Sequence, residues 1–265
     1  MMVKLRNTLY KAAHEAGDIL KENFTKTFEI KSKDHIANLV TAIDHQSEQK
    51  IMEVIKTDFP EHDILTEESG FFDKKSEYKW IIDPIDGTVN YAHGIPLTCV
   101  SIGIEHKGEI ILGAVYNPMM NEYFFAEKGS GAYLNDIKIE VSKESNFGKA
   151  LLVTGFPYNS SENKNNPAEI FTDIVYKNIP VRRLGSAAID LCWTACGRFE
   201  GFWEFDLNPW DIAAGCLIME EAGGKLTNFN NEKLDIYGKE ILATNGLIHK
   251  ELLEVVSNRA FGEKK

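Results

Sequence analysis

The chain has 265 residues, of which 43% are hydrophobic and 26% charged, and its formal net charge is −11 at pH 7. This length and apolar fraction are sufficient for a large core, either as one domain or as two closely packed halves. The acidic balance argues against a primary role in binding nucleic acid, because phosphate backbones are bound by surfaces rich in Lys and Arg, and no apolar run approaches the length of a membrane span.

Hydrophobic spacing predicts two long helices near the N-terminus. The first covers residues 5–24, where apolar residues recur at helical intervals. The second opens at Thr41, which can cap it, and ends before Pro60, with Asp44 in its first turn, where the helix dipole favours an anion. A short strand and a polar loop are predicted between the two helices, over residues 28–35.

Two short apolar strands are then predicted to deliver acidic residues at their ends. The first leads into Glu67, and the second, over residues 80–82, leads into Asp83. Pro84 is predicted to end the second strand, because proline has no N–H to give to a neighbouring strand. The charged segment between them, residues 71–79, is predicted to be an exposed connector.

The residues that follow this strand suggest a site for a metal ion and a phosphate. Asp86 comes three residues after Asp83, and Gly87 permits a tight backbone and the close approach of a ligand. Two crowded carboxylates repel each other unless a cation is present, and hard cations such as Mg²⁺ bind through a few carboxylates plus phosphate and water. For this motif alone, a turn with two solvated acids is the alternative.

The rest of the chain is predicted to hold a strand meander and then a mixed second half. The meander has strands over residues 100–105, 110–116 and 122–127, and residues 129–131 form a hairpin turn. The second half is predicted to start at residue 151. Its helices cover 167–178, 185–196, 210–222 and 247–256, its strands cover 199–205 and 225–227, and residues 159–166 form a loop.

The four cysteines predict no disulfide framework. Cys99, Cys192, Cys196 and Cys216 all have apolar surroundings, and no C-x-x-C pair or nearby His completes a zinc site. With no signal peptide recognised, we expect buried, reduced thiols and a cytoplasmic protein.

Three motifs together carry a resemblance to a known family. They are E-E-S at residues 67–69, D-P-I-D-G-T at 83–88, and W-D-I-A-A-G at 210–215 followed by E-A-G-G at 221–224. In this order they closely resemble the inositol monophosphatase family, part of the lithium-sensitive, magnesium-dependent phosphatase superfamily. The resemblance extends from about residue 31 to about residue 244.

The resemblance implies an α+β fold, a layered αβαβα sandwich of the inositol monophosphatase and fructose-bisphosphatase type. We expect one domain over residues 1–265 in two packed halves. The half up to about residue 145 would carry most metal ligands, and the half from about 146 would carry Asp211 and the polyol contacts. Family members are commonly dimers, so a homodimer is expected.

The resemblance also implies two or three Mg²⁺ ions in each site. One ion is assigned to Glu67, Asp83 and the backbone carbonyl of Ile85, and a second to Asp83, Asp86 and Asp211. A third, weaker ion would lie near Glu67, held mostly by water. Paired metal ions activate a water and stabilise the attacking and leaving oxygens of a phosphate ester.

The family pattern further assigns catalytic and substrate-binding roles. Glu67 and Thr88 flank the nucleophilic water, Asp44 accepts a hydrogen bond from the Thr88 hydroxyl, and no covalent intermediate forms. The expected substrate contacts are Asp86, Gly87, Thr88, Gly185, Ser186, Ala187, Glu204 and Asp211.

These observations predict a phosphatase that acts on inositol monophosphate, with two alternatives. Residues 205–209 resemble bacterial members, which leaves open a broader enzyme acting on NADP(H), fructose 1,6-bisphosphate or other sugar phosphates. The other alternative is a regulatory binding protein, because some bacterial relatives assist transcription complexes. A degenerate regulator would be expected to lose carboxylates, and here the whole set is present, although regulation through a separate surface stays open.

Overall fold

The computed structural model describes the chain except for residues 25–29, 33–38, 158–166 and 261–265. The loop predicted at 159–166 therefore lies outside the described residues, as does most of the strand and loop predicted over 28–35. The side chain of Thr41 and its predicted cap lie outside them too.

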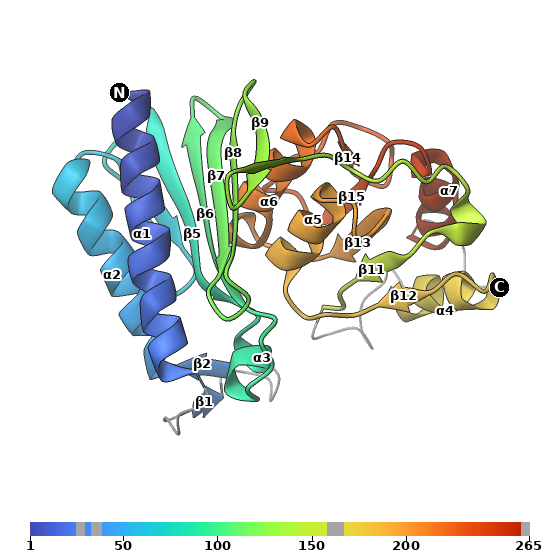
Figure 1. Ribbon diagram of the computed structural model, residues 1–265, viewed down its shortest axis with the longest axis horizontal. Coiled ribbons are helices and arrows are strands. Elements are labelled where there is room, and N and C mark those ends of the chain that lie inside the picture. Colours follow the sequence, from blue (N-terminus) through green and yellow to red (C-terminus); the bar gives the residue numbers. More distant parts are fainter. Residues whose placement is uncertain (25–29, 33–38, 158–166, 261–265) are drawn as a thin grey trace.

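The elements stack in five layers (Figure 1). Helices α1 (Met2–Asn23) and α2 (Ala42–Asp58) cover the outer face of an eight-stranded sheet. Helices α5 (Ala187–Ala195) and α6 (Pro209–Glu221) form the central layer. A five-stranded sheet follows, and α4 (Pro167–Tyr176) and α7 (His249–Ala260) cover its far side. This is the αβαβα order that the family resemblance implies.

The first sheet contains the predicted meander. Its strand order is β10-β9-β8-β7-β6-β5-β3-β4, and all neighbours are antiparallel except β3 and β5. The strands are β3 (Asp63–Thr66), β4 (Gly70–Phe72), β5 (Tyr78–Asp86), β6 (Cys99–His106), β7 (Glu109–Asn117), β8 (Glu122–Glu127), β9 (Gly131–Leu134) and β10 (Ile137–Ile139). The smaller elements nearby are β1 (Ile30–Ser32), β2 (Leu39–Thr41) and α3 (Thr88–Ala92). The 3-10 turn Phe147–Lys149 lies on the other side of the molecule, where Phe147 packs against the core formed with α4 and α7.

The second sheet contains three strands that the sequence pattern did not predict, over residues 152–154, 181–182 and 240–244. Its order is β12-β11-β13-β15-β14, and the strands are β11 (Leu152–Thr154), β12 (Val181–Arg182), β13 (Gly201–Phe205), β14 (Lys225–Thr227) and β15 (Glu240–Thr244). β15 lies between β13 and β14 and pairs with both. Because it is almost wholly buried, its side chains lack the polar alternation that marks a half-exposed strand.

The prediction of an exposed connector over residues 71–79 is partly wrong. Gly70, with a φ of +79°, turns the chain back so that β4 pairs with β3, placing Phe71 opposite Leu65. β5 begins at Tyr78, earlier than expected. The sequence of this segment is rich in charged residues and so does not suggest strands. The strands form because segments elsewhere in the chain supply their hydrogen-bond partners.

Strand β5 also continues past the position where Pro84 was predicted to end it. Asp83 lies opposite Ser101 and Asp86 opposite Cys99, so β5 carries one residue more than β6 over this stretch, which is a β-bulge. Pro84 lies inside the bulge, where its missing N–H breaks no ladder hydrogen bond. The bulge keeps Asp83 and Asp86 on one continuous strand.

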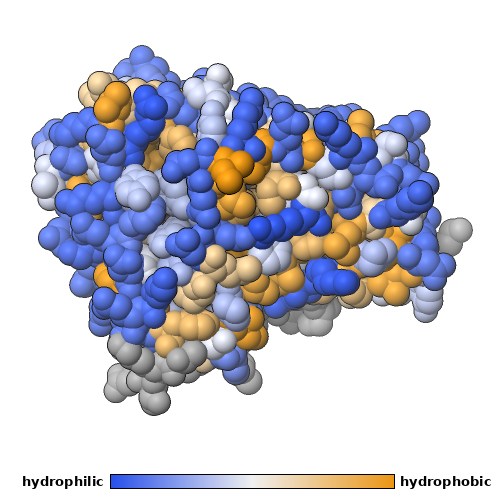
Figure 2. Space-filling model, in the orientation of Figure 1, coloured by the Kyte–Doolittle hydropathy of each residue, from blue (hydrophilic) through white to orange (hydrophobic). Residues whose placement is uncertain are grey.

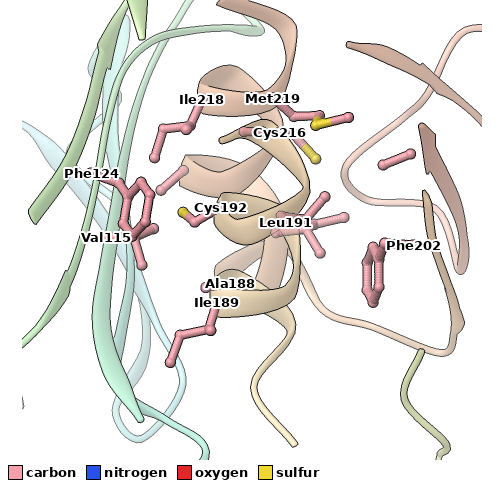
Figure 3. Close-up of a cluster of buried hydrophobic side chains, with 14 of the residues drawn as sticks. Val115, Phe124, Ala188, Ile189, Leu191, Cys192, Phe202, Cys216, Ile218 and Met219 are labelled. Atoms are coloured by element: carbon pink, nitrogen blue, oxygen red, sulfur yellow. The ribbon is translucent and has the colours of Figure 1, made fainter. Parts of the chain in front are cut away.

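The central helical layer has apolar contacts on both of its faces (Figure 3). Val115 and Phe124 of the first sheet lie on one side of α5, and Leu191 points toward Phe202 of the second sheet on the other. In α6 the buried run extends from Ile212 to Met219, as expected for a helix enclosed by protein.

Two glycines allow α6 to lie directly on the first sheet. A Cβ at Gly113 would come 2.8 Å from the Ala214 carbonyl oxygen, and one at Gly103 would come 3.0 Å from the Ala213 Cβ. Larger residues would push α6 away from β6 and β7. This close packing determines where the first turn of α6, with Asp211, lies relative to β5.

The surface visible in Figure 2 is mainly hydrophilic, with apolar residues in separate patches. All four cysteines are free, and Cys99, Cys192 and Cys216 are buried as predicted, whereas Cys196 is only half-buried. Within the described ranges, no helix is both long and apolar enough to cross a membrane.

Candidate active site

A pocket of about 400 Å³ opens where the ends of several elements meet. Its size is within the range of about 300–1,000 Å³ that is typical of small-molecule sites. The predicted site residues that line it are Glu67, Asp83, Ile85, Asp86, Gly87, Thr88, Gly185, Ser186, Ala187, Glu204 and Asp211. Both halves of the chain thus contribute to one site, although the family roles of these residues stay predictions.

Asp83 and Asp86 enter the pocket from the end of β5. Asp83 is buried, and its Oδ1 accepts a hydrogen bond from the Ile85 N–H at 3.0 Å across the bulge. Asp86 Oδ2 accepts hydrogen bonds from the Ser186 hydroxyl and the Ala188 N–H, both at 2.7 Å. Because Ser186 is the N-cap residue of α5, these bonds join the first sheet to the central layer.

Asp211 enters from the first turn of α6. Its Oδ2 accepts a hydrogen bond from the Asn208 N–H at 2.7 Å, which is the return bond of a capping box. The Ser101 hydroxyl of β6 donates to the Trp210 carbonyl at 3.3 Å. The start of α6 is therefore tied to the strand that pairs with β5.

The turn that carries Glu67 is held by a buried acid that the sequence analysis did not select. Glu48 of α2 accepts hydrogen bonds from the Thr66 hydroxyl at 2.6 Å, from the backbone N–H groups of Glu68 and Ser69, and from the Ser69 hydroxyl. These bonds fix the turn immediately after β3. In the sequence, Glu48 looks like any polar residue of an amphipathic helix.

The Gly87–Thr88 turn follows the bulge and begins α3. Gly87 has a φ of +89°, and a Cβ there would come 2.8 Å from the Leu97 carbonyl oxygen, so both conformation and space require glycine. The Thr88 hydroxyl donates to the Ile85 carbonyl at 3.0 Å. The Thr88 hydroxyl has one proton, which it donates to the Ile85 carbonyl. The hydrogen bond from Thr88 to Asp44 that the family resemblance implies is therefore not formed in this structure.

Asp44 lies behind the pocket and is not part of its lining. Its side chain is buried at the start of α2. Burial and other acids of the pocket have the largest effects in raising the pKa of Asp83, and the negative charge of Asp44 raises it further. The Asp44 and Asp83 carboxylates are therefore close. Asp44 thus belongs to the same charged cluster, although the predicted bond to Thr88 is absent.

Glu204 occupies the opposite side of the pocket, on β13. It is 8% exposed, and burial raises its pKa well above the usual range, with Asp211 and Asp86 raising it further. The carboxylate lies against Gly155, because a Cβ there would come 2.0 Å from Glu204 Oε1. Gly155 therefore provides the space that Glu204 occupies.

The carboxylates form an extended row rather than a compact group. Burial raises the pKa of Asp83 first, and the charges that raise it further belong to Glu67, Asp86, Asp211 and Asp44. Burial likewise raises the pKa of Asp190, but there the neighbouring charges are Glu204 and Asp86. Since charge interactions weaken with distance, Glu67 and Asp83 lie at one end of the row and Glu204 and Asp190 at the other.

The pocket lining also includes residues that the sequence analysis did not select, among them Asp190 and Arg183. Asp190 is 1% exposed, and within the described part of the chain neither of its carboxylate oxygens has a hydrogen-bond partner. The one feature of the sequence that could have marked Asp190 is that it is an acid inside the apolar helix α5. Arg183 follows β12, and no motif marked it.

The donor set of the pocket fits a hard divalent cation. Among the described residues, the lining includes several carboxylates and no Cys or His, which is the oxygen-rich chemistry that Mg²⁺ prefers. Burial also raises the pKa of Asp86 to about 6, partly opposed by its bonds to Ser186 and Ala188, so its charged form needs compensation. As these side chains are placed, however, no described group of three or more His, Cys, Asp or Glu is arranged to hold a metal ion.

Comparison with known proteins assigns the family. The family model described as "Inositol monophosphatase family" matches residues 1–260. This chain belongs to the inositol monophosphatase family. The predicted family is therefore confirmed, and the family is generally metal-dependent.

Similar proteins carry three kinds of name. The Synechocystis inositol-1-monophosphatase is 43% identical over 91% of this chain and 85% of its own length. The Aquifex aeolicus fructose-1,6-bisphosphatase/inositol-1-monophosphatase is 41% identical over 92% of both chains. The putative Nus factor SuhB of Neisseria meningitidis serogroup B is 39% identical over 95% of this chain and 97% of its own.

The fold prediction is confirmed by a solved structure. The inositol monophosphatase from Anabaena (Nostoc) sp. matches with a TM-score of 0.85 and 40% identity, covering 96% of this chain and 95% of that one.

Proposed function

We propose that this chain, a phosphoric monoester hydrolase of the inositol monophosphatase family, hydrolyses inositol monophosphate to inositol and phosphate with Mg²⁺. The observation that supports this most strongly is the single pocket in which Glu67, Asp83, Asp86 and Asp211 meet the Gly87–Thr88 turn. Uncatalysed hydrolysis of phosphate monoesters is among the slowest of biological reactions. A row of metal-binding carboxylates beside phosphate-binding backbone groups addresses that difficulty directly.

The proposed roles divide along the row of carboxylates. Bound Mg²⁺ would lower the pKa of a water and neutralise phosphate oxygens, held by Glu67, Asp83, the Ile85 carbonyl, Asp86 and Asp211. The backbone N–H groups of Gly87 and Thr88 would orient the phosphate, and Glu67 and Thr88 would orient the attacking water. Glu204, with Gly185, Ser186 and Ala187, would bind the hydroxyls of the leaving alcohol.

The domain organisation and the assembly follow the same proposal. The sheet that carries Asp83 and Asp86 supplies most metal ligands, and the second half supplies Asp211 and the alcohol side. We propose that the two halves act as one domain and that the protein is a homodimer. Light scattering of the purified protein tests the assembly state.

A phosphatase panel tests the proposed function. The purified protein is assayed with inositol 1-phosphate, fructose 1,6-bisphosphate, NADP and 4-nitrophenyl phosphate, each with Mg²⁺ and with EDTA. We expect Mg²⁺-dependent phosphate release, with the highest kcat/KM for inositol 1-phosphate. Phosphate release that is the same in EDTA, or from none of the four compounds, would refute the proposal.

The name of the Aquifex relative supports fructose 1,6-bisphosphate as a second candidate substrate. The Nus factor names support a regulatory role for those relatives, and for this chain such a role would have to operate together with the intact carboxylate set. The panel decides between the substrates. Binding of the purified protein to a transcription complex, with and without Asp83→Asn, separates regulation from catalysis.

Replacing Thr88 with Ala is expected to lower kcat about tenfold to a hundredfold with a smaller change in KM. The hydroxyl holds the Ile85 carbonyl and is proposed to position the water, which matters more in the transition state than in the ground state. Removing the hydroxyl leaves its buried partners unpaired, which costs about 1–3 kcal/mol. Steady-state kinetics test this, and Thr88→Ser, which keeps the hydroxyl, serves as the control. A rise in KM at constant kcat would contradict the assigned role.

Replacing Glu204 with Gln is expected to raise KM for inositol 1-phosphate about tenfold to a hundredfold and to spare 4-nitrophenyl phosphate. The two substrates share the phosphate but not the hydroxylated alcohol that Glu204 is proposed to bind. Gly155→Ala should reproduce this selective loss, because the added Cβ displaces the Glu204 carboxylate.

The matched control for Glu204 is Glu200→Gln. Glu200 is also buried, but it lies outside the pocket lining, and its Oε2 accepts a hydrogen bond from the Leu151 N–H at 2.7 Å. An equal loss for both substrates in Glu204→Gln would show that Glu204 supports the metal site instead.

A further inference from the structure

Arg183 differs from the other arginines whose side chains the structure describes. Arg6 forms an ion pair with Glu127 at 3.2 Å, Arg198 pairs with Glu122, and Arg182 Nη1 donates to the Val181 carbonyl at 3.1 Å. Within the described residues, Arg183 has no hydrogen bond and no carboxylate oxygen within 4.0 Å of its nitrogens. Its guanidinium donors are therefore free to bind a ligand.

The backbone around Arg183 is fixed beside the phosphate turn. Asn90 of α3 donates from Nδ2 to the Leu184 carbonyl at 2.8 Å, and Gly185 has a φ of +90°. A Cβ at Gly185 would come 3.2 Å from Arg183 Nη1. The guanidinium thus folds back over Gly185, and Arg183 is an exposed residue of the pocket lining.

Arg183 lies at the alcohol end of the carboxylate row. Burial and the neighbouring acids raise the pKa of Asp190 and of Glu204, and the Arg183 guanidinium opposes the rise in both. It is therefore close to these two acids without touching either. At the other end of the row, where the phosphate is proposed to react, the pKa of Asp83 is raised by burial and by neighbouring acids, and Arg183 is not among the groups that affect it.

We propose that Arg183 is a specificity-determining residue that binds a second anionic group, a phosphate on the alcohol portion of the substrate. This inference rests on the proposed function, because it assumes that the reacting phosphate binds at the Gly87–Thr88 turn. The pocket then takes bisphosphorylated polyols or sugars as well as monophosphates, and Arg183 favours the bisphosphates.

The chemistry of the residue suits this role. A guanidinium stays charged at every physiological pH and presents paired donors that match phosphate oxygens. Without it, Asp190 and Glu204 would repel a second phosphate at this end of the pocket. A neutral polyol does not need this charge, so its binding should depend little on Arg183.

The test uses two ligands that differ only in the second phosphate, fructose 1-phosphate and fructose 1,6-bisphosphate. Each competes against hydrolysis of 4-nitrophenyl phosphate in Mg²⁺, so an inhibition constant is obtained whether or not the competitor turns over. We expect the wild-type protein to bind the bisphosphate more tightly than the monophosphate. In Arg183→Met this preference should fall about tenfold to a hundredfold, while the constant for the monophosphate stays nearly the same.

Arg182→Met is the matched control. Successive residues of an extended segment point to opposite sides, and Arg182 is exposed but does not line the pocket. It should leave both inhibition constants unchanged. Arg183→Lys should keep part of the preference, since it retains the charge but not the paired donors. Thermal midpoints should be equal for all variants, because Arg183 has no partner within the described structure.

The outcomes separate the two proposals. A wild-type protein that hydrolyses no phosphate monoester refutes the proposed function. A protein that hydrolyses 4-nitrophenyl phosphate but shows no preference for the bisphosphate refutes the role of Arg183. An equal loss of both ligands in Arg183→Met also refutes it, because Arg183 would then bind the phosphate that the two ligands share.

Discussion

Asp83→Asn is expected to lower kcat about a thousandfold or more while leaving the fold intact. Asp83 is the one residue assigned to both principal metal ions, so neutralising it weakens both. Metal-ion stabilisation of the transition state amounts to several kcal/mol, and each 1.36 kcal/mol or so corresponds to a factor of about ten in rate. An asparagine oxygen can still accept the hydrogen bond from the Ile85 N–H, so the bulge is expected to persist.

The measurement is kcat at saturating Mg²⁺, with circular dichroism and thermal unfolding to show that the variant is folded. Asp63→Asn is the control, because Asp63 is also a buried acid of this sheet but lies at the start of β3, where it accepts hydrogen bonds from the Lys74 and Ser76 N–H groups. It should keep nearly full activity per folded molecule. A fully active Asp83→Asn enzyme at ordinary Mg²⁺ would remove Asp83 from the metal site.

The second large effect is expected on stability: without divalent ions, the thermal midpoint should fall as the pH rises from about 4 through about 6 and above. Burial raises the pKa of Asp83, Asp86, Asp211, Glu204 and Asp190 in the folded protein, in the case of Asp86 to about 6. In the unfolded chain these groups titrate near 4. Between the two pKa values the unfolded state binds fewer protons, so raising the pH favours unfolding.

Mg²⁺ should reverse this trend, because it compensates the charged carboxylates. At a concentration about a hundredfold above Kd, a ligand that binds only the folded state contributes about 2.7 kcal/mol. At about 2–4 °C per kcal/mol for a chain of this size, the midpoint at pH 8 should rise by about 5–10 °C. Unfolding scans from pH 4 to 8 in EDTA and in Mg²⁺ measure both effects.

A variant without one buried charge isolates the cause. Asp190 is proposed neither as a metal ligand nor as a substrate contact, and its oxygens have no partner in the described structure. Asp190→Asn should therefore raise the midpoint at pH 8 in EDTA more than at pH 4. If the wild-type midpoint in EDTA is constant or rises over this range, the pocket carboxylates are not the dominant titrating groups.

Much of the secondary structure followed from the sequence for simple physical reasons. Helices α1 and α2 each bury one apolar stripe, so their 3.6-residue period is visible. The meander strands β6, β7 and β8 are separated by short turns and pair with their chain neighbours. In these elements the local pattern and the final environment agree.

Elements whose environment is built by distant segments were predicted poorly. β4 forms only because β3 offers it a free edge. β15 lies between two other strands and shows no alternation. Pro84 is accommodated because the bulge lets β5 resume pairing at Asp86.

For the candidate site, the sequence by itself determined which chemical groups are present and in what order. The three motifs were sufficient to name the family and the carboxylates that the structure brings into one pocket. What the tertiary structure alone decided is how these groups are held and what surrounds them. Gly113 lets α6 reach the sheet, Glu48 clamps the Glu67 turn, and Gly155 makes room for Glu204. The sequence also did not indicate that Arg183 and Asp190 lie near the Glu204 carboxylate. Contacts between distant segments depend on packing and leave no periodic pattern in the chain.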